Sequence, residues 1–227
     1  MLRRILLACG ILGSLLYVGI DVIAAIGYPE YHSFTSRVIS ELMARGAPTE
    51  HLVDPLFLLY DVLVLAFAVG VWMSRAATRL RLAAALLAAY AVLGSLGPTI
   101  AEMNLRGSGG PKSADILHIA LTMVLVILML ATMVLVASTQ RRAFRIYSYA
   151  TMAIMALFGV LTSFAMRGVD TGEPTPWVGL LERIDIGAFL LWEALLAITL
   201  LQNQAGMGVT AMQGPGTEMP QSPLPAR

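Results

Sequence analysis

The chain has 227 residues, of which 58% are hydrophobic and only 13% are charged. Soluble domains carry about 25% charged residues, so this composition indicates an integral membrane protein. The formal net charge of +1 says nothing about partners. No basic cluster is combined with aromatic residues in the way that nucleic-acid binding requires.

Six apolar segments follow one another along the chain. Each is close to the roughly 20 residues that a helix needs to cross a ~30 Å hydrocarbon core. The loops between them are short, which favours one compact all-α bundle with sequential helices in contact. Glycine pairs such as Gly94 and Gly97 would allow neighbouring helices to approach closely. We therefore predict a six-helix transmembrane domain over residues 1–202, with helices at about 5–26, 55–73, 80–101, 114–137, 145–166 and 178–201.

Basic residues predict the orientation of this bundle. One side carries arginines and no acid before the C-terminal tail, whereas the other side mixes basic residues with acids. The arginine-rich side is expected to be cytoplasmic. Both termini then lie inside in a multi-pass plasma-membrane protein, and residues 203–227, rich in Gly, Pro, Gln and Met, form a disordered cytoplasmic tail. The arginines concerned are Arg3, Arg4, Arg75, Arg79, Arg81, Arg141, Arg142 and Arg145.

The first outer loop contains a helical pattern. Phe34, Val38 and Leu42 recur at i, i+4 and i+8, which predicts a short amphipathic helix over residues 34–42 on the outer interface. This loop is the expected lid of any pocket beneath it. The lid candidates are Tyr31, His32, Ser40 and Glu41.

The last apolar segment carries three acids, Glu182, Asp185 and Glu193. At 100° per residue, they form one acidic stripe along the helix. A charged residue at the bilayer centre costs roughly 2.5–3.5 kcal/mol on insertion scales, so three acids in one span require partners.

Ionisable residues on other segments share a depth with this stripe. At 1.5 Å per residue, Asp21 lies about 7 Å inside the outer ends of the helices, Asp61 about 9 Å and His118 about 6 Å. Glu182 and Asp185 lie about 6 and 10 Å inside, and Glu193 about 22 Å. We interpret this layer as a pocket. Its ligand or pocket candidates are Asp21, Asp61, Asp115, His118, Glu182, Asp185 and Glu193.

A purely structural interpretation competes with the pocket. Asp115 and Glu182 lie near the starts of helices, where the positive end of the helix dipole favours an acid. For Asp115 alone we favour that interpretation. For Asp61, Glu182 and Asp185 together with His118 we favour a functional pocket.

Carboxylates packed together in a medium of low dielectric constant cannot all be ionised. They need a cation, a shared proton or arginine partners, and Arg37, Arg167 and Arg183 are available. We expect His118 to lie within hydrogen-bond or one-water reach of Asp61, Glu182 or Asp185. A divalent metal is a further alternative, with His118, Asp61 and Glu182 as candidate ligands, and the sequence predicts no other cofactor.

Three stretches carry a family resemblance. Tyr28 to Leu42, with its Ser40-Glu41-Leu42, resembles the first outer loop of the domain-of-unknown-function 998 membrane proteins. Asp115 to Leu121 and Gly179 to Arg183 are similar to that family's later motifs. The resemblance covers about residues 5–201 and implies a six-helix bundle without implying an activity.

A more distant resemblance is to the membrane hydrolase superfamily that includes alkaline ceramidases. It implies a zinc site made of several histidines with Asp and Ser. This chain has three histidines, and His32 and His51 lie in a loop. A three-histidine site would therefore require that loop to fold into the bundle.

Four functions remain as alternatives. The leading hypothesis is a carboxylate/histidine pocket in the outer half of the bundle that binds a cation or a small polar or lipid-headgroup ligand. The others are a membrane-embedded lipid hydrolase or other lipid-modifying enzyme, a proton-coupled transporter, and a ligand-free membrane scaffold. The sequence does not fix the oligomeric state.

Overall fold

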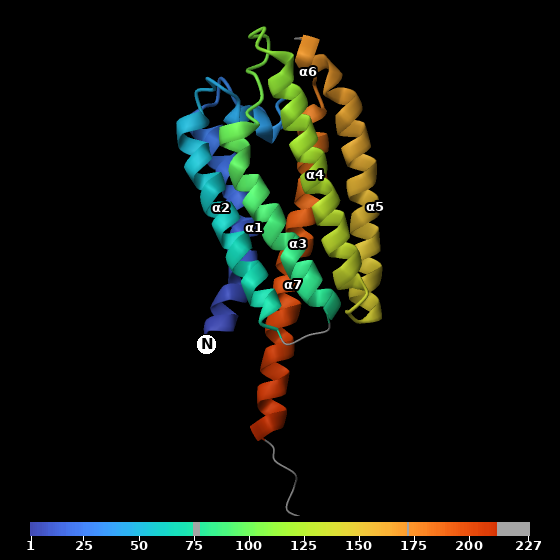
Figure 1. Cartoon of the computed structure of the whole chain (residues 1–227). Coiled ribbons are helices and arrows are strands. Elements are labelled where there is room, and N and C mark those ends of the chain that lie inside the picture. Colours follow the sequence, from blue (N-terminus) through green and yellow to red (C-terminus); the bar gives the residue numbers. More distant parts are fainter. Residues whose placement is uncertain (75–77, 172, 213–227) are drawn as a thin grey trace, which may run out of the picture.

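The computed structural model describes residues 1–74, 78–171 and 173–212 (Figure 1). Within that part, six helices are long and apolar enough to cross a membrane, so the predicted all-α fold with six spans is confirmed. Two short helices, η1 and α6, lie between them. The helices are α1 (Leu2–Gly27), η1 (Ile39–Met43), α2 (Glu50–Trp72), α3 (Thr78–Ile100), α4 (Lys112–Ala137), α5 (Arg142–Ala165), α6 (Arg167–Thr171) and α7 (Val178–Met212).

The six long helices form a ring. Each packs mainly against two others, in the order α1, α2, α3, α4, α5 and α7, and α7 closes the ring against α1 (Figure 1). Sequential helices are therefore neighbours, as the short loops predict. We call the end of the bundle that carries residues 28–49, 101–111 and 166–177 the loop face. The end that carries residue 1 and the 138–141 turn is the terminal face.

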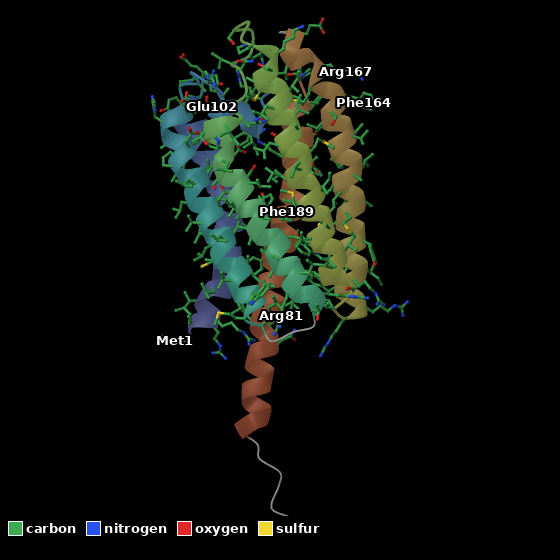
Figure 2. The ribbon with its side chains drawn as sticks, viewed as in Figure 1. Met1, Arg81, Glu102, Phe164, Arg167 and Phe189 are labelled. Atoms are coloured by element: carbon green, nitrogen blue, oxygen red, sulfur yellow. The ribbon has the colours of Figure 1, made fainter. Side chains whose placement is uncertain are left out.

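Charged side chains gather at these two ends. Figure 2 shows Glu102 and Arg167 at the loop face, Met1 and Arg81 at the terminal face, and Phe189 between them. This distribution is what a bilayer requires, because charges lie at its surfaces and the span between them is apolar.

The half of the ring next to the terminal face is tightly packed. Phe67, Phe189 and Trp192 are each 0% exposed there. Small residues bring α1 and α2 together, since a Cβ at Gly10 would lie 2.9 Å from the Phe67 ring and one at Gly70 would lie 2.9 Å from a backbone nitrogen of α1. Such close approach drives helix association in membranes, where lipid is as apolar as the helix surfaces.

The half next to the loop face is packed unevenly. Loop residues Ile39 and Leu42 are buried against α1 and α2. In contrast, no residue is buried in 92–100 of α3, 112–128 of α4 or 156–165 of α5. On the α3, α4 and α5 side of the ring, side chains at this end are therefore exposed or half-buried.

The predicted amphipathic helix over residues 34–42 is wrong in extent and position. The loop forms only the 3₁₀-helix η1, and Val38, Ile39 and Leu42 are buried rather than lipid-facing. The reason lies in the backbone carbonyls of residues 34–37, which accept hydrogen bonds from α7 and from Arg106. An α-helix would need those carbonyls for its own bonds.

Two helix limits also differ from the predicted ones. α2 begins at Glu50, ahead of the expected residue 55, and Pro55 lies inside the helix. α7 continues to Met212, so residues 203–212 of the predicted disordered tail are helical. Residues 213–227 of that tail, and Arg75 of the predicted cytoplasmic set, lie outside the described residues.

Candidate functional site

Arg183 of α7 joins the last helix to the first. Its Nε donates to Asp21 Oδ2 and its Nη2 donates to Asp21 Oδ1, and both distances are 2.7 Å. His32 Nε2 lies 2.8 Å from the same Oδ1, and the His32 side chain is 2% exposed. The predicted pocket acid Asp21 is thus matched by an arginine and a histidine. His32, a lid candidate, is a fixed part of this group.

The same arginine fastens the 28–49 loop to α7. Arg183 Nη1 donates to the carbonyls of Phe34 (3.1 Å) and Arg37 (2.7 Å). The backbone N–H groups of Gly179 and Leu180 donate to the carbonyl of Thr35 at 2.8 and 3.3 Å. These bonds satisfy N–H groups at the start of α7 that have no partner within the helix. The loop therefore lies as a docked cap over α7.

Glu182 is a second point of attachment. Its Oε2 accepts a hydrogen bond from the Ile39 N–H. Glu182 thus faces the loop backbone instead of an open pocket.

Glu41 is the centre of a second charged group. Its fully buried carboxylate accepts from Arg37 Nη1 at 3.1 Å, and from Arg106 Nε and Nη2 at 2.8 and 2.7 Å. Its Oε2 also accepts from the Val38 N–H at 3.0 Å. The Tyr31 hydroxyl donates to the Glu41 carbonyl at 2.7 Å.

Two neighbours of Glu41, Arg106 and Tyr31, have raised pKa values. The hydrogen bonds to Glu41 raise the pKa of Arg106, and burial raises the pKa of Tyr31. A raised folded-state pKa means that the stabilisation from charged Arg106 is present at every pH below its ordinary value. It is lost only in stronger base. Arg106 therefore stays positively charged at any working pH.

A pocket of about 360 Å³ lies beside this group at the loop face. It lies between the 28–49 loop, the 101–111 loop and the segment that precedes α7. Its lining residues are Ser36, Arg37, Arg106, Pro174, Thr175 and Pro176. The lid candidates Tyr31, His32, Ser40 and Glu41 are not among these lining residues.

Asp115 and His118 bind the 101–111 loop. Asp115 Oδ1 accepts from the Asn104 N–H and Oδ2 from Asn104 Nδ2, both at 2.8 Å. His118 Nδ1 lies 2.9 Å from the Ala101 carbonyl. In the described part of the chain His118 forms no hydrogen bond or ion pair with a carboxylate, so the direct form of the expected approach to Asp61, Glu182 or Asp185 is not made. An approach through one water stays a prediction.

Three acids remain inside the ring. Asp61 of α2 is 7% exposed and has no hydrogen-bond or ion-pair partner among the described residues. Asp185 Oδ1 is buried without a partner, and its Oδ2 faces Gly159 of α5. Glu193 is 0% exposed, and its Oε1 has no partner.

Within the described part of the chain, the Glu193 carboxylate has one hydrogen bond, and it is long. Its Oε2 lies 3.4 Å from Ser14 Oγ, which also lies 2.9 Å from the carbonyls of Gly10 and Leu190. A hydroxyl has a single hydrogen to share among these three acceptors. Nearby, the hydroxyls of Tyr60 and Tyr90 pair with each other at 3.1 Å.

These placements divide the predicted site. Asp21, Glu182 and Asp115 hold loops, whereas Asp61, Asp185 and Glu193 lie inside the ring. Among the described residues, no group of three or more His, Cys, Asp or Glu side chains could hold a metal ion.

Sequence reasoning missed Arg106 and Thr175. Arg106 belongs to the Gly-rich turn 106–111, which offers no pattern that pairs it with Glu41. The count of charges gives no signal either, because the first loop has cations of its own, Arg37 and Arg45.

No curated protein and no solved structure matches the chain. The model of a family of proteins of unknown function, DUF998, matches residues 11–199, which confirms the resemblance of the three sequence motifs. The chain therefore belongs to the DUF998 family of membrane proteins.

Proposed function

We propose that the protein binds a small cation or polar ligand inside its helix ring, with Asp61, Asp185 and Glu193 as the groups that hold it. One observation carries the proposal. The loop-face acids Asp21 and Glu41 have arginine partners, whereas these three have no cationic partner among the described residues.

The energetics of the membrane support this assignment. An acid in a span costs roughly 2.5–3.5 kcal/mol on insertion scales. A bound cation or a bound proton would supply the missing partner.

Two alternatives are affected differently by the geometry. Proton-coupled transport uses the same acids, and Glu193, deeper than the other two, would extend the path toward the terminal face. A lipid-modifying enzyme based on His118 has less support, because the His118 imidazole bonds to the Ala101 carbonyl. The metal-ligand candidates His118, Asp61 and Glu182 also form no cluster among the described residues.

The arrangement in the membrane is part of the proposal. Arg4, Arg79, Arg81, Arg141 and Arg142 border the terminal face. On the positive-inside rule the terminal face is cytoplasmic and the loop face is outside, in the plasma membrane.

The test measures the thermal stability of the purified protein in detergent at constant ionic strength. Sodium, potassium or methylamine replaces N-methylglucamine, and pH is varied in a separate series. A ligand that binds only the folded state raises Tm with its concentration. We expect such a rise for the wild type, and we expect Asp61→Asn, Asp185→Asn or Glu193→Gln to abolish it.

Glu102→Gln is the matched control, because Glu102 already pairs with Arg45 at the surface. A wild-type Tm that responds to no cation and no pH change would overturn the proposal. It would leave the ligand-free scaffold as the best account.

A further inference from the structure

The pocket at the loop face is lined by positive charge, in contrast to Asp61, Asp185 and Glu193, which we call the inner acids. Two of its lining residues are arginines, and a third is a threonine whose hydroxyl accepts from Arg106 Nη1 at 2.7 Å. The Thr175 hydroxyl in turn donates to the Ser36 carbonyl at 3.1 Å. The polar wall of the pocket is therefore held in place by its own hydrogen bonds.

Positive charge is in excess at this wall. Arg37 and Arg106 share the single carboxylate of Glu41, while Arg183 is matched by Asp21. Glu182, a further acid nearby, does not line the pocket and bonds to the backbone N–H of Ile39.

The Arg37 guanidinium has hydrogen-bond donors that are not used within the described chain. Among the described residues only its Nη1 has acceptors, so the Nε and Nη2 hydrogens are free. Its guanidinium lies over the Tyr31 ring, 4.3 Å from the centroid, which fixes the plane. A held guanidinium with two free donor groups suits bidentate recognition of a phosphate.

The position of the pocket adds to this charge. Pro174, Thr175 and Pro176 lie one residue before α7, whose N-terminus is the positive end of its dipole. The adjacent Trp177 is 61% exposed, as expected of an aromatic anchor at the membrane interface. The pocket thus lies at the height of lipid headgroups.

We propose that this pocket binds a phosphate ester, with Arg37 as the main contact and Arg106 and Thr175 as its support. The phosphate is carried either by an anionic lipid headgroup or by a soluble molecule. A volume of about 360 Å³ is sufficient for one such group. This site is separate from the inner acids and does not depend on the function proposed for them.

The experiment compares two sources of phosphate. The protein is placed in nanodiscs of phosphatidylcholine with or without phosphatidylglycerol, and, separately, in detergent with inorganic phosphate or glycerol 3-phosphate. Tm and lipid retained in native mass spectrometry are measured. Stabilisation by phosphatidylglycerol alone identifies a headgroup site, and stabilisation by the soluble phosphates identifies a soluble ligand.

The variants are Arg37→Gln and Thr175→Val, with Arg45→Gln as control. Arg45 lies in the same loop and pairs with Glu102 at 2.9 Å, and its side chain is 63% exposed. We expect Arg37→Gln to weaken binding at least about tenfold, because a hydrogen bond to a charged group is lost. Thr175→Val should weaken it less, and Arg45→Gln and Asp61→Asn should not change it.

Wild-type affinity in Arg37→Gln and in Thr175→Val would overturn the proposal. So would a wild-type protein that responds to neither source of phosphate. If Arg37→Gln fails to fold, phosphate binding by Thr175→Val and Arg37→Lys tests the proposal instead. Arg37→Lys should weaken binding, since Lys keeps the charge but loses the two-pronged set of donors.

Discussion

Arg183 and Asp21 form a two-point ion pair between the last and the first spanning helix, with both N–O distances at 2.7 Å. The two side chains are only 12% and 11% exposed. Arg183 also donates to loop carbonyls, so one side chain ties α7 both to α1 and to the 28–49 loop.

The first prediction concerns the removal of this pair. Arg183→Gln should lower the free energy of unfolding by about 3–5 kcal/mol, because it leaves a buried carboxylate without its cation. Asp21→Asn should cost a similar amount. The double variant should cost clearly less than the sum of the two, since neither charge is then left alone.

Denaturant or thermal unfolding in detergent measures this effect. Arg45→Gln is the control, because a surface ion pair is worth only about 0–1 kcal/mol. Strict additivity in the double variant would show that the pair does not act as a unit.

The second prediction uses Gly179, where α7 meets the loop. A Cβ at this position would overlap the Arg37 carbonyl oxygen, a backbone atom that cannot move aside cheaply. Gly179→Ala should therefore undock the cap, lower Tm and expose the 28–49 loop to protease. Gly187→Ala on the same helix is the control, since its Cβ would meet nothing within 4 Å, and it should be neutral or stabilise by up to about 1 kcal/mol. Equal protease resistance of the two variants would refute the docked cap.

The architecture could be predicted from the sequence because hydropathy acts over whole segments. The six spans and the contact of sequential helices follow from apolar length and short loops, and small errors at helix ends do not alter them. The end of α7 at Met212 shows where this reasoning stops, because a polar composition does not forbid continuation of an established helix.

The site could be predicted only in part. The depth of an acid follows from its position in a span, and Asp61, Asp185 and Glu193 lie within the long helices α2 and α7. Its partner depends on which loop folds over it. Arg106 reaches Glu41 across 65 residues, and residues 34–37 give their carbonyls to Arg106 and α7 instead of to a helix. No local pattern encodes those pairings.

The third prediction couples Gly94 to Asp61. A Cβ at Gly94 would lie 2.8 Å from Asp61 Oδ1, whereas one at Gly97 would lie 3.9 Å from Leu121. Gly94→Ala should cost about 1–3 kcal/mol through overpacking, and Gly97→Ala should be tolerated. In an Asp61→Ala background the cost at Gly94 should vanish, because the clashing oxygen is gone. A thermal-stability cycle of the four proteins measures the coupling, and a cost that persists in that background would contradict the contact.

The last prediction concerns the attachment of α5, whose buried residues Ser148, Thr151 and Met155 all lie toward the terminal face. There Trp192 Nε1 donates to Ser148 Oγ at 2.9 Å, and both residues are 0% exposed. Ser148→Ala should lower stability by about 1–3 kcal/mol, because the indole N–H is left unpaired where water cannot replace the hydroxyl. Ser163→Ala is the control on the same helix: among the described residues its exposed hydroxyl bonds only to the Gly159 carbonyl, so its loss should change Tm little. In a Trp192→Phe background the cost of Ser148→Ala should shrink, since no indole N–H remains to be stranded. If Ser148→Ala is as mild as Ser163→Ala, the hydrogen bond does not hold α5, and packing alone keeps that helix in the ring.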